Sequence, residues 1–330
     1  MKDILNYLFT YKTLDKDQAK GILIKLAQGE YNNSQVAAFM TVFLMRNVTV
    51  EELSGFRDAM LELCKPVDVS AYNTIDVCGT GGDAKDSFNI STLTSFVVAG
   101  AGQMVTKHGN YGVSSVSGSS NVMEHFGYRF TSSTDELLRN LETLNICFMH
   151  APLFHPAMKN VAPIRKELGV KTFFNMLGPM VNPAQPKNQF VGVFSLELAR
   201  LYGYLYQQTD KSYSIIHSLD GYDEVSLTSD FKVINNQGEN VLSPAQLGLK
   251  QHLPAAISGG KTVAEAARIF EDVLNGSGSE AQNQAVIANA TLALQTANRS
   301  LSLDEAREKA EASLFSGKAK QIFKKLIERG

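Results

Sequence analysis

A polar stretch without a single carboxylate is the part of the chain best suited to chemistry. No Asp or Glu occurs between Asp86 and Glu124, although the stretch is rich in Gly, Ser, Thr and Asn and contains Lys107 and His108. Backbone amides of glycine turns, hydroxyl groups and a lysine can hold phosphate oxygens, and a carboxylate among them would repel such a ligand. The stretch therefore predicts a pocket for an anion.

A glycine loop precedes this stretch. Gly79-Thr80-Gly81-Gly82-Asp83 follows the β-leaning run Thr74–Cys78, so a strand would feed a turn whose amides approach a ligand closely. The window Gly79–Ala84 also fits the loose dinucleotide pattern G-x-G-x-x-[GA], but the acidic residue expected about 20 positions later is missing. The triphosphate-binding pattern G-x-x-x-x-G-K-[ST] fails because its lysine is missing. Taken alone, such a turn is as often structural as functional.

The next polar group is Asn89-Ile90-Ser91-Thr92. These residue types can cap a helix or bind phosphate, and the two roles are compatible. A helix running from Thr92 through Leu93, Phe96 and Val97 would direct its N-terminal amides at an anion and anchor its apolar face in the core.

A second strand-and-loop follows. Lys107-His108-Gly109-Asn110-Tyr111 comes after the β-leaning run Met104–Thr106, and two serine-rich runs, 114–115 and 117–121, complete the polar stretch. The order GTGGD, NIST, KHGN and SGS resembles the phosphoribosyl pyrophosphate site of the anthranilate phosphoribosyltransferases. Because several separated motifs stand in the right order, coincidence is improbable, whereas any one of them alone is a weak signal.

The resemblance spans most of the chain. It continues through His155–Met158, Arg165 with Glu167–Gly169, Asn175–Pro179 and Asp223–Ser226. The chain departs from the pattern at two places. Similar enzymes usually carry Arg where this chain has Tyr111, and Ala-Asp where it has Ser120-Asn121, so the positioning of groups near Asn110 is open.

The resemblance implies three sets of ligand-binding residues. The set for phosphoribosyl pyrophosphate is Gly79, Gly82, Asp83, Ser87, Asn89, Ile90, Ser91, Thr92, Lys107, His108, Gly109, Asn110, Tyr111, Gly112, Val113, Ser114, Ser115 and Ser119. The set for anthranilate is Gly79, His108, Asn110, Pro152, His155 and Arg165. Two Mg²⁺ ions are implied, one on Ser91 and Glu224 and the other on Asp223 and Glu224.

The charged residues of these sets also have ordinary interpretations. An acidic pair such as Asp223-Glu224, after the β-leaning run Tyr213–His217, is usually solvated, yet Mg²⁺ prefers one or two carboxylates together with waters and substrate phosphates. Arg165 lies in a helix-like run, where a surface salt bridge is the default interpretation. Its planar guanidinium nevertheless matches a carboxylate such as that of anthranilate.

The histidines indicate no metal centre, because no Cys or acidic ligand accompanies His150 and His155 at a usable spacing. The resemblance instead places His155 with Pro152 in the channel of the aromatic substrate. His108 is either a general base or a residue that only positions anthranilate, since an aromatic amine can lose its proton late. The histidines expected to be structural are His125, His150, His217 and His252.

Composition excludes several classes. The chain has 44% apolar and 19% charged residues, and no apolar run approaches the roughly 20 residues that cross a bilayer. Its N-terminus lacks signal-peptide features, so we expect a cytoplasmic protein. A net charge of −2 gives no basic field for nucleic acid. Cys64, Cys78 and Cys147 are far apart, which indicates buried thiols rather than disulfides.

Hydrophobic periodicity predicts helices over residues 1–66, and capping-box patterns begin at Thr49, Ser133, Thr262 and Ser302. Further β-leaning runs at 190–194 and 213–217 alternate with helix-like segments such as 133–144, which favours an α/β sheet. The C-terminal third is again helical.

The expected fold class is α/β, like that of the nucleoside-phosphorylase-like phosphoribosyltransferases. The resemblance implies a small helical domain, residues 1–66 with a return segment near 166–185, and a large α/β domain, residues 67–330, whose central sheet is flanked by helices. It further implies transfer of a phosphoribosyl group to anthranilate in tryptophan biosynthesis, in a cleft between the domains of a homodimer. Two alternatives stay open: a pyrimidine nucleoside phosphorylase, which the KHGN run disfavours, and a non-enzymatic nucleic-acid-binding relative, which the near-neutral charge disfavours.

Overall fold

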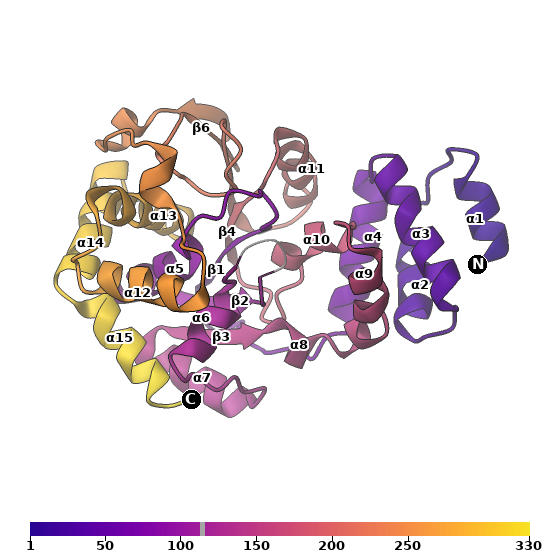
Figure 1. Cartoon of the computed structure of the whole chain (residues 1–330), viewed down its shortest axis with the longest axis horizontal. Coiled ribbons are helices and arrows are strands. Elements are labelled where there is room, and N and C mark those ends of the chain that lie inside the picture. The colour runs from indigo at the N-terminus through magenta and orange to yellow at the C-terminus, as the bar shows by residue number, and fades with distance from the viewer. Residues whose placement is uncertain (113–115) are drawn as a thin grey trace. The chain divides into compact units, whose positions relative to one another are not determined.

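The computed structural model describes residues 1–112 and 116–330. The chain forms two compact units (Figure 1): the first contains Met1–Val67 and Ala151–Pro183, and the second contains Asp68–His150 and Ala184–Gly330. The return segment of the first unit begins at Ala151 rather than near residue 166. The reason is that the third strand of the sheet ends at His150, so the chain leaves the sheet there.

The first unit is helical. Its helices are α1 (Lys2–Leu8), α2 (Lys16–Ala27), α3 (Asn33–Met45), α4 (Val50–Glu62), α8 (Ala151–Phe154), α9 (Ala162–Leu168) and α10 (Phe174–Leu177), with 3₁₀ turns η1 (Pro156–Asn160) and η2 (Gly178–Met180). Capping boxes at Asp15, Asn32 and Thr49 begin α2, α3 and α4, which confirms the box predicted at Thr49. These boxes satisfy backbone amides that a helix start would otherwise leave without partners.

An aromatic cluster forms the core of this unit. Phe56 stacks on Phe173 with ring centroids 4.3 Å apart, and Phe39 and Phe43 meet both rings edge-on at 5.2–6.1 Å. Offset-stacked and edge-on pairs add to the stability gained from burial. Because Phe173 comes from the return segment, that segment completes the core of the helical unit.

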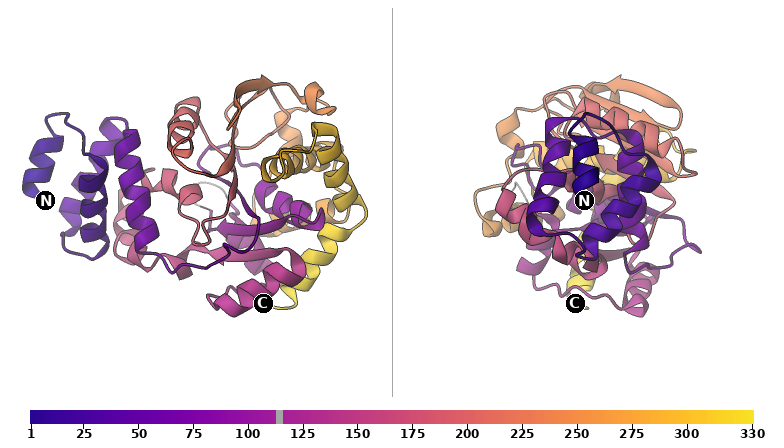
Figure 2. Two further views of the ribbon diagram at one scale, coloured as in Figure 1. Left: turned by 180° about the vertical axis from the view of Figure 1, so that it is seen from behind. Right: turned by 90° about the vertical axis from the view of Figure 1, so that its right-hand side faces the viewer.

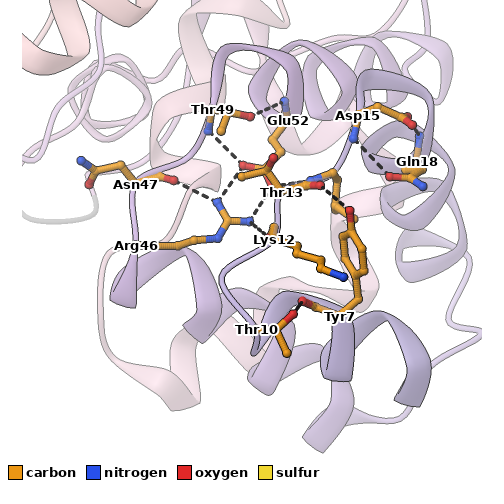
Figure 3. Close-up of polar contacts among 11 residues, drawn as sticks. Tyr7, Thr10, Lys12, Thr13, Asp15, Gln18, Arg46, Asn47, Thr49 and Glu52 are labelled. Carbon is orange, nitrogen blue, oxygen red and sulfur yellow. Dashed lines mark hydrogen bonds and ion pairs between the residues drawn. The ribbon is translucent and has the colours of Figure 1, made fainter.

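Glu52 joins three parts of the helical unit (Figure 3). Its side chain, which is fully buried, accepts hydrogen bonds from the backbone amides of Leu14 and Thr49 at 3.0 and 2.9 Å and from both terminal nitrogens of Arg46 at 2.9 and 2.5 Å. Burial alone would raise the pKa of Glu52, but the bonds from Arg46, Thr49 and Leu14 outweigh it and lower the pKa. One carboxylate therefore caps α4 and ties it to the α1–α2 and α3–α4 turns.

The second unit contains a seven-stranded sheet. Its strands are β1 (Thr74–Gly79), β2 (Met104–Gly109), β3 (Ile146–His150), β4 (Asn188–Gly192), β5 (Ser212–Ser218), β6 (Phe231–Asn235) and β7 (Gly238–Leu242), in the order β3-β2-β1-β4-β5-β6-β7. The first five of these are parallel, and β6 and β7 are antiparallel additions at one edge. The parallel strands are almost entirely buried, as expected for strands covered on both faces.

Helices cover both faces of the sheet. Those of the second unit are α5 (Ile90–Gly100), α6 (Ser119–His125), α7 (Thr134–Leu144), α11 (Leu196–Tyr206), α12 (Val263–Leu274), α13 (Glu280–Ala297), α14 (Leu303–Phe315) and α15 (Lys318–Ile327), with 3₁₀ turns η3 (Pro244–Leu247) and η4 (Pro254–Ile257). Right-handed crossovers place α5 and α7 on one face and α11 on the other, because β1 leads to β2 in one direction and β4 leads to β5 in the opposite direction. Figure 1 and Figure 2 show α13, α14 and α15 on the side of α5, away from α11.

Several local predictions need correction. Ser133 and Thr262 cap α7 and α12 by accepting from Glu136 and Glu265, but neither glutamate completes the box, whereas Ser302 and Glu305 do. The second strand runs to Gly109, so Lys107 and His108 belong to the strand rather than to a loop after it. α5 begins at Ile90, before the expected Thr92.

The three cysteines are free and buried, as predicted. Burial raises the pKa of Cys147 to about 12, so its thiol stays protonated and unreactive. Among the described residues there is no helix with the length and apolar character needed to cross a bilayer.

Candidate active site

The site of the second unit lies where the sheet reverses its winding direction. β1 and β4 are neighbours, and their last residues, Gly79 and Gly192, are paired in the parallel register. In open α/β sheets, ligands bind beyond the carboxyl ends of the strands at such a reversal. The glycine loop after β1 and the acidic pair after β5 both begin at this edge.

Glycine at both strand ends lets Asp223 approach closely. A Cβ on Gly192 would lie 1.3 Å from the carbonyl oxygen of Asp223, and one on Gly79 would lie 2.5 Å from its carboxylate. The Asp223 carboxylate also accepts a hydrogen bond of 2.7 Å from the amide of Gly81. The backbone therefore seats Asp223 directly over the ends of β1 and β4.

Glu224 faces the start of α5. Its carboxylate accepts from the hydroxyl of Ser87 at 3.1 Å and from the amide of Ser91 at 3.3 Å. The loop behind it is fixed, because the Ser218 hydroxyl donates to the carbonyl of Glu224 at 2.6 Å and Asn289 of α13 holds both backbone groups of Val225. The structure thus brings Ser87, Ser91, Asp223 and Glu224 together.

The two carboxyl groups are strained electrostatically. Burial, followed by repulsion from Asp83, raises the pKa of Asp223 to about 7. Burial and repulsion from Asp223 and Asp83 raise the pKa of Glu224 well above its usual range. Within the described part of the chain, neither carboxylate forms an ion pair with a Lys, Arg or His, so the concentrated negative charge suits an added cation. The described residues contain no group of three or more His, Cys, Asp or Glu arranged as a complete metal cage.

The glycine loop has the backbone conformation that only glycine adopts easily. Gly81 and Gly82 have φ values of +64° and +79°, in the left-handed region. Asn89 does not cap α5 with its side chain, and its amide group donates instead to the carbonyl of Ser117 at 2.9 Å. Because the Asn89 side chain does not occupy the first amides of α5, the positive end of the helix dipole can act on Glu224 or on a ligand. The side chain of Ile90 is fully buried, so only its backbone can contact a ligand.

Lys107 and His108 sit deeper than expected. The Lys107 amine is buried and donates to the carbonyl of Val77 at 2.8 Å, and the amide of His108 donates to the carboxylate of Asp76 at 3.2 Å. Lys107 in this structure therefore supports the β1–β2 pairing, and its ammonium group keeps two further N–H donors.

The backbone after β2 folds against the serine-rich run. Asn110 exchanges hydrogen bonds with Ser119 at 3.2 Å, and Gly112 donates to the side chain of Asn121 at 2.9 Å. Tyr111 is 41% exposed, and its hydroxyl donates to Glu124 at 2.7 Å. The predicted ligands Val113, Ser114 and Ser115 lie outside the described residues.

The same region contains buried polar atoms without protein partners. Among the described residues of the glycine loop, the start of α5 and the serine-rich run, five such oxygens have no hydrogen-bond partner: Thr80 Oγ1, Asp83 Oδ2, Asn89 Oδ1, Thr92 Oγ1 and Ser117 Oγ. Leaving a buried polar atom unpaired costs about 1–3 kcal/mol, so a cluster of them indicates a ligand or bound water.

The first unit contains the other predicted residues. Arg165 in α9 is part-buried, its guanidinium donates to Asn175 at 3.2 Å and lies 5.2 Å from the centre of the Phe174 ring, and burial lowers its pKa. His155 is 4% exposed and Pro152 is exposed. These three residues belong to one unit, and Gly79, His108 and Asn110 belong to the other.

Four positioning residues escaped the sequence reasoning: Asp76, Asn121, Gly192 and Asn289. Asp76 alternates with apolar residues in a predicted strand, and a carboxylate in a buried strand suggests a special role for that residue. Gly192 lies inside a β-leaning run, and a glycine there suggests that another part of the backbone approaches closely. Asn289 carries no signal, because its partner Val225 is distant in sequence.

Comparison with known families identifies the class to which the acidic pair, the glycine loop and the helical unit belong. Residues 71–320 match the glycosyl transferase family, a/b domain, and residues 2–64 match the glycosyl transferase family, helical bundle domain.

Within that class, the chain belongs to the anthranilate phosphoribosyltransferase family. It is 58% identical over 326 residues to an anthranilate phosphoribosyltransferase from Christiangramia forsetii, covering 99% of this chain and 98% of that protein. It is 52% identical to one from Bacteroides fragilis, covering 99% of both. Solved structures agree: the Thermus thermophilus enzyme has a TM-score of 0.92 at 31% identity, covering 98% of both chains. The Saccharomyces cerevisiae enzyme in complex with PRPP and Mg has a TM-score of 0.91 at 25% identity, covering 98% of this chain and 96% of that one.

Proposed function

We propose that this enzyme transfers the 5-phosphoribosyl group of phosphoribosyl pyrophosphate to the amine of anthranilate, giving N-(5-phosphoribosyl)anthranilate and pyrophosphate in tryptophan biosynthesis. The observation that carries the proposal lies beyond β1 and β4, where the amides of Gly81 and Ser91 donate to the carboxylates of Asp223 and Glu224 and nearby loop residues have buried side-chain oxygens without protein partners. Such a group of donors and carboxylates matches an anionic sugar that arrives with a cation. The relatives' shared name, over nearly the full chain, supports the same reaction.

The donor contacts follow from the geometry of the second unit. The amides of the glycine loop and of the first turn of α5 supply hydrogen bonds and a positive dipole end for phosphate oxygens. The Asn89 Oδ1 can accept from a ligand hydroxyl, and the hydroxyls of Thr92 and Ser117 can donate to phosphate oxygens. Fixed donors of this kind stabilise charge on the departing pyrophosphate without reorganising, so the bond from ribose C1 can lengthen toward an oxocarbenium-like state before the amine attacks. No covalent enzyme intermediate is needed, and the configuration at C1 is inverted.

Asp223, Glu224 and Ser91 would hold Mg²⁺. The fit rests on two buried carboxylates of raised pKa that have no cationic partner among the described residues. Mg²⁺ is usually bound by one or two carboxylates with waters and substrate phosphates, so an incomplete protein cage is expected. Mg²⁺ would neutralise pyrophosphate oxygens when bound. The yeast relative's complex with PRPP and Mg supports the use of the ion, and two ions per site are part of the proposal.

The acceptor contacts in this proposal are those that the family resemblance implies. The Arg165 guanidinium would bind the carboxylate of anthranilate in two-pronged geometry, and Pro152 and His155 would contact its ring. His108 would position the amine or accept its proton. Arg165 is already held by Asn175 and by the Phe174 ring, so little of its side-chain entropy would be lost on binding.

We further propose a cytoplasmic homodimer formed through the helical unit. Five large apolar side chains of α1, α3 and the turn after α1 are exposed: Tyr7, Phe9, Tyr11, Leu44 and Met45. Exposed apolar residues concentrated on one region indicate an interaction surface.

A two-variant experiment tests the function. Fluorescence of anthranilate is followed in the presence of phosphoribosyl pyrophosphate and Mg²⁺, and consumption by the unaltered enzyme is the required result. Asp223→Asn with Glu224→Gln should lose most activity at limiting Mg²⁺, because the cation loses both carboxylates. Arg165→Ala should raise KM for anthranilate more than KM for the donor, because it removes only the acceptor's counter-charge. No consumption by the unaltered enzyme would overturn the proposal, and near-normal kinetics of the double variant would overturn the metal assignment.

A further inference from the structure

One side-chain oxygen holds two backbone amides that are six positions apart in sequence. Asn121, in the first turn of α6, accepts hydrogen bonds from the amide of Gly112 at 2.9 Å and from the amide of Gly118 at 3.0 Å. Both partners are donors, so the atom that faces them must be the amide oxygen, which fixes the orientation of the Asn121 side chain. We call Gly112, Gly118 and Asn121 the clasp.

The backbone around the clasp is pressed together. A Cβ on Gly118 would lie 2.1 Å from the amide nitrogen of Gly112, and a Cβ on Gly109 would lie 2.5 Å from the hydroxyl of Ser119. The amide of Ser120 also donates to the carbonyl of Asn110 at 3.1 Å. Two segments, 109–112 and 117–120, therefore run in direct backbone contact, and Asn121 is the side chain that bonds to both of them.

These segments carry groups assigned to the donor. Asn110 lies in the first segment. Ser117, in the second, has a buried hydroxyl without a protein partner and a carbonyl that accepts from Asn89. Movement of either segment would displace these groups together. An error of about 1 Å in the position of a binding group can cost up to a hundredfold in rate.

We propose that Asn121 is a positioning residue for the phosphoribosyl donor, acting through the clasp. The inference rests on the proposed function, since it assigns the adjoining groups to that donor. The Asn121 oxygen already accepts two hydrogen bonds, which is its usual capacity, so this oxygen serves the clasp. Its removal should therefore weaken donor binding while leaving the acidic pair after β5 intact.

Hydrogen exchange of the Gly112 and Gly118 amides in the free protein tests the clasp directly. Asn121→Ala should speed exchange of both amides by roughly tenfold or more, because each loses its acceptor. Asn121→Asp should keep them protected, since a carboxylate oxygen of the same reach accepts both bonds. The matched control is Asn298→Ala, which removes an asparagine that accepts from the Ser300 amide at 3.1 Å in the turn after α13 and should leave both glycine amides unchanged.

Kinetics tests the role of the clasp. Asn121→Ala should raise KM for phosphoribosyl pyrophosphate roughly tenfold while changing KM for anthranilate less than half as much, and Asn298→Ala should change neither. Asn121→Asp introduces the residue that similar enzymes usually carry at this position, so it should leave KM for the donor nearly unchanged. If Asn121→Ala does not fold, Asn121→Gln replaces it, since the extra methylene moves the oxygen away from both amides.

Unchanged exchange in Asn121→Ala would overturn the clasp. Faster exchange with an unchanged donor KM would overturn its role in donor binding. If the unaltered enzyme fails to consume anthranilate, the proposed function falls, and the exchange measurement still decides whether the clasp exists.

Discussion

Two glycines decide where the acidic pair can lie. Gly79 and Gly192 end adjacent strands, and any side chain on either would occupy space that Asp223 fills. At Gly192 the obstructing atoms belong to the backbone of Asp223, which cannot rotate away as a side chain can. A methyl group at position 192 would therefore force the loop that carries the carboxylates to move.

Gly192→Ala should displace this loop and lower both stability and activity. Overpacking of this kind costs about 1–3 kcal/mol, and loss of metal-dependent activity should exceed what that destabilisation explains at a temperature where the variant is folded. The matched control is Gly21→Ala in α2, where nothing lies within 4 Å of the new methyl group. It should stabilise the protein by about 0.5–1 kcal/mol, because alanine favours a helix interior. Urea denaturation and activity assays on both variants check this, and an active Gly192→Ala enzyme would contradict it.

At the scale of elements, hydrophobic periodicity and the positions of turn and capping residues predicted the α/β class, the helical N-terminal region and most strand positions. They could not predict that β2 extends through Lys107 and His108, because polar residues inside a strand read as loop until their buried partners, the Val77 carbonyl and Asp76, are known. They also overstated the capping boxes at Ser133 and Thr262, since a glutamate at the right spacing can bond elsewhere: Glu265 accepts from Lys261 at 2.6 Å. The site residues came from motif order, whereas the clasp and Asn289 depend on contacts that spacing does not encode.

The start of α4 depends on Glu52, so Glu52→Gln should be strongly destabilising. Removing one partner of a buried ion pair costs about 3–5 kcal/mol, and the retained amide oxygen places the expected loss near the lower value. The pKa of Glu52 is lowered in the folded protein, so its stabilisation is complete above the unfolded value near 4.5 and is lost as pH falls through the folded value.

The difference in free energy of unfolding between Glu52→Gln and the unaltered protein should therefore be large at pH 7 and shrink below about pH 4. Exposed Glu62→Gln, which disturbs a surface pair with Lys20, is the control and should cost under about 1 kcal/mol. A gap that stays constant down to pH 3 would show that the ion pair is not its cause.

At the scale of the whole molecule, the exposed apolar side chains of the helical unit should govern association. Tyr11 and Met45 are 82% and 80% exposed, which is costly for a free surface and expected for a covered one. The negative charge of −2 over the whole chain is too small to keep copies apart.

Tyr11→Glu with Met45→Glu should convert a dimer into monomers at micromolar concentration, because two buried charges per copy would be unpaired at the interface. Light scattering coupled to size-exclusion chromatography reports the mass. Leu253→Glu, at an equally exposed position of the second unit, should leave the mass unchanged. A monomeric unaltered protein would end the proposal of a dimer.

The discontinuous helical unit has a consequence during synthesis. Phe39, Phe43 and Phe56 leave the ribosome early, but Phe173, against which they pack, follows about a hundred residues later. At translation speeds of roughly 5–20 residues per second, these rings stay uncovered for several seconds or longer, and three of the seven strands, β1, β2 and β3, are made in the meantime. Chaperone capture or slow translation in this interval would act on the N-terminal helices first. The amount of enzyme that a cell accumulates should therefore depend on how fast the residues between Phe56 and Phe173 are translated.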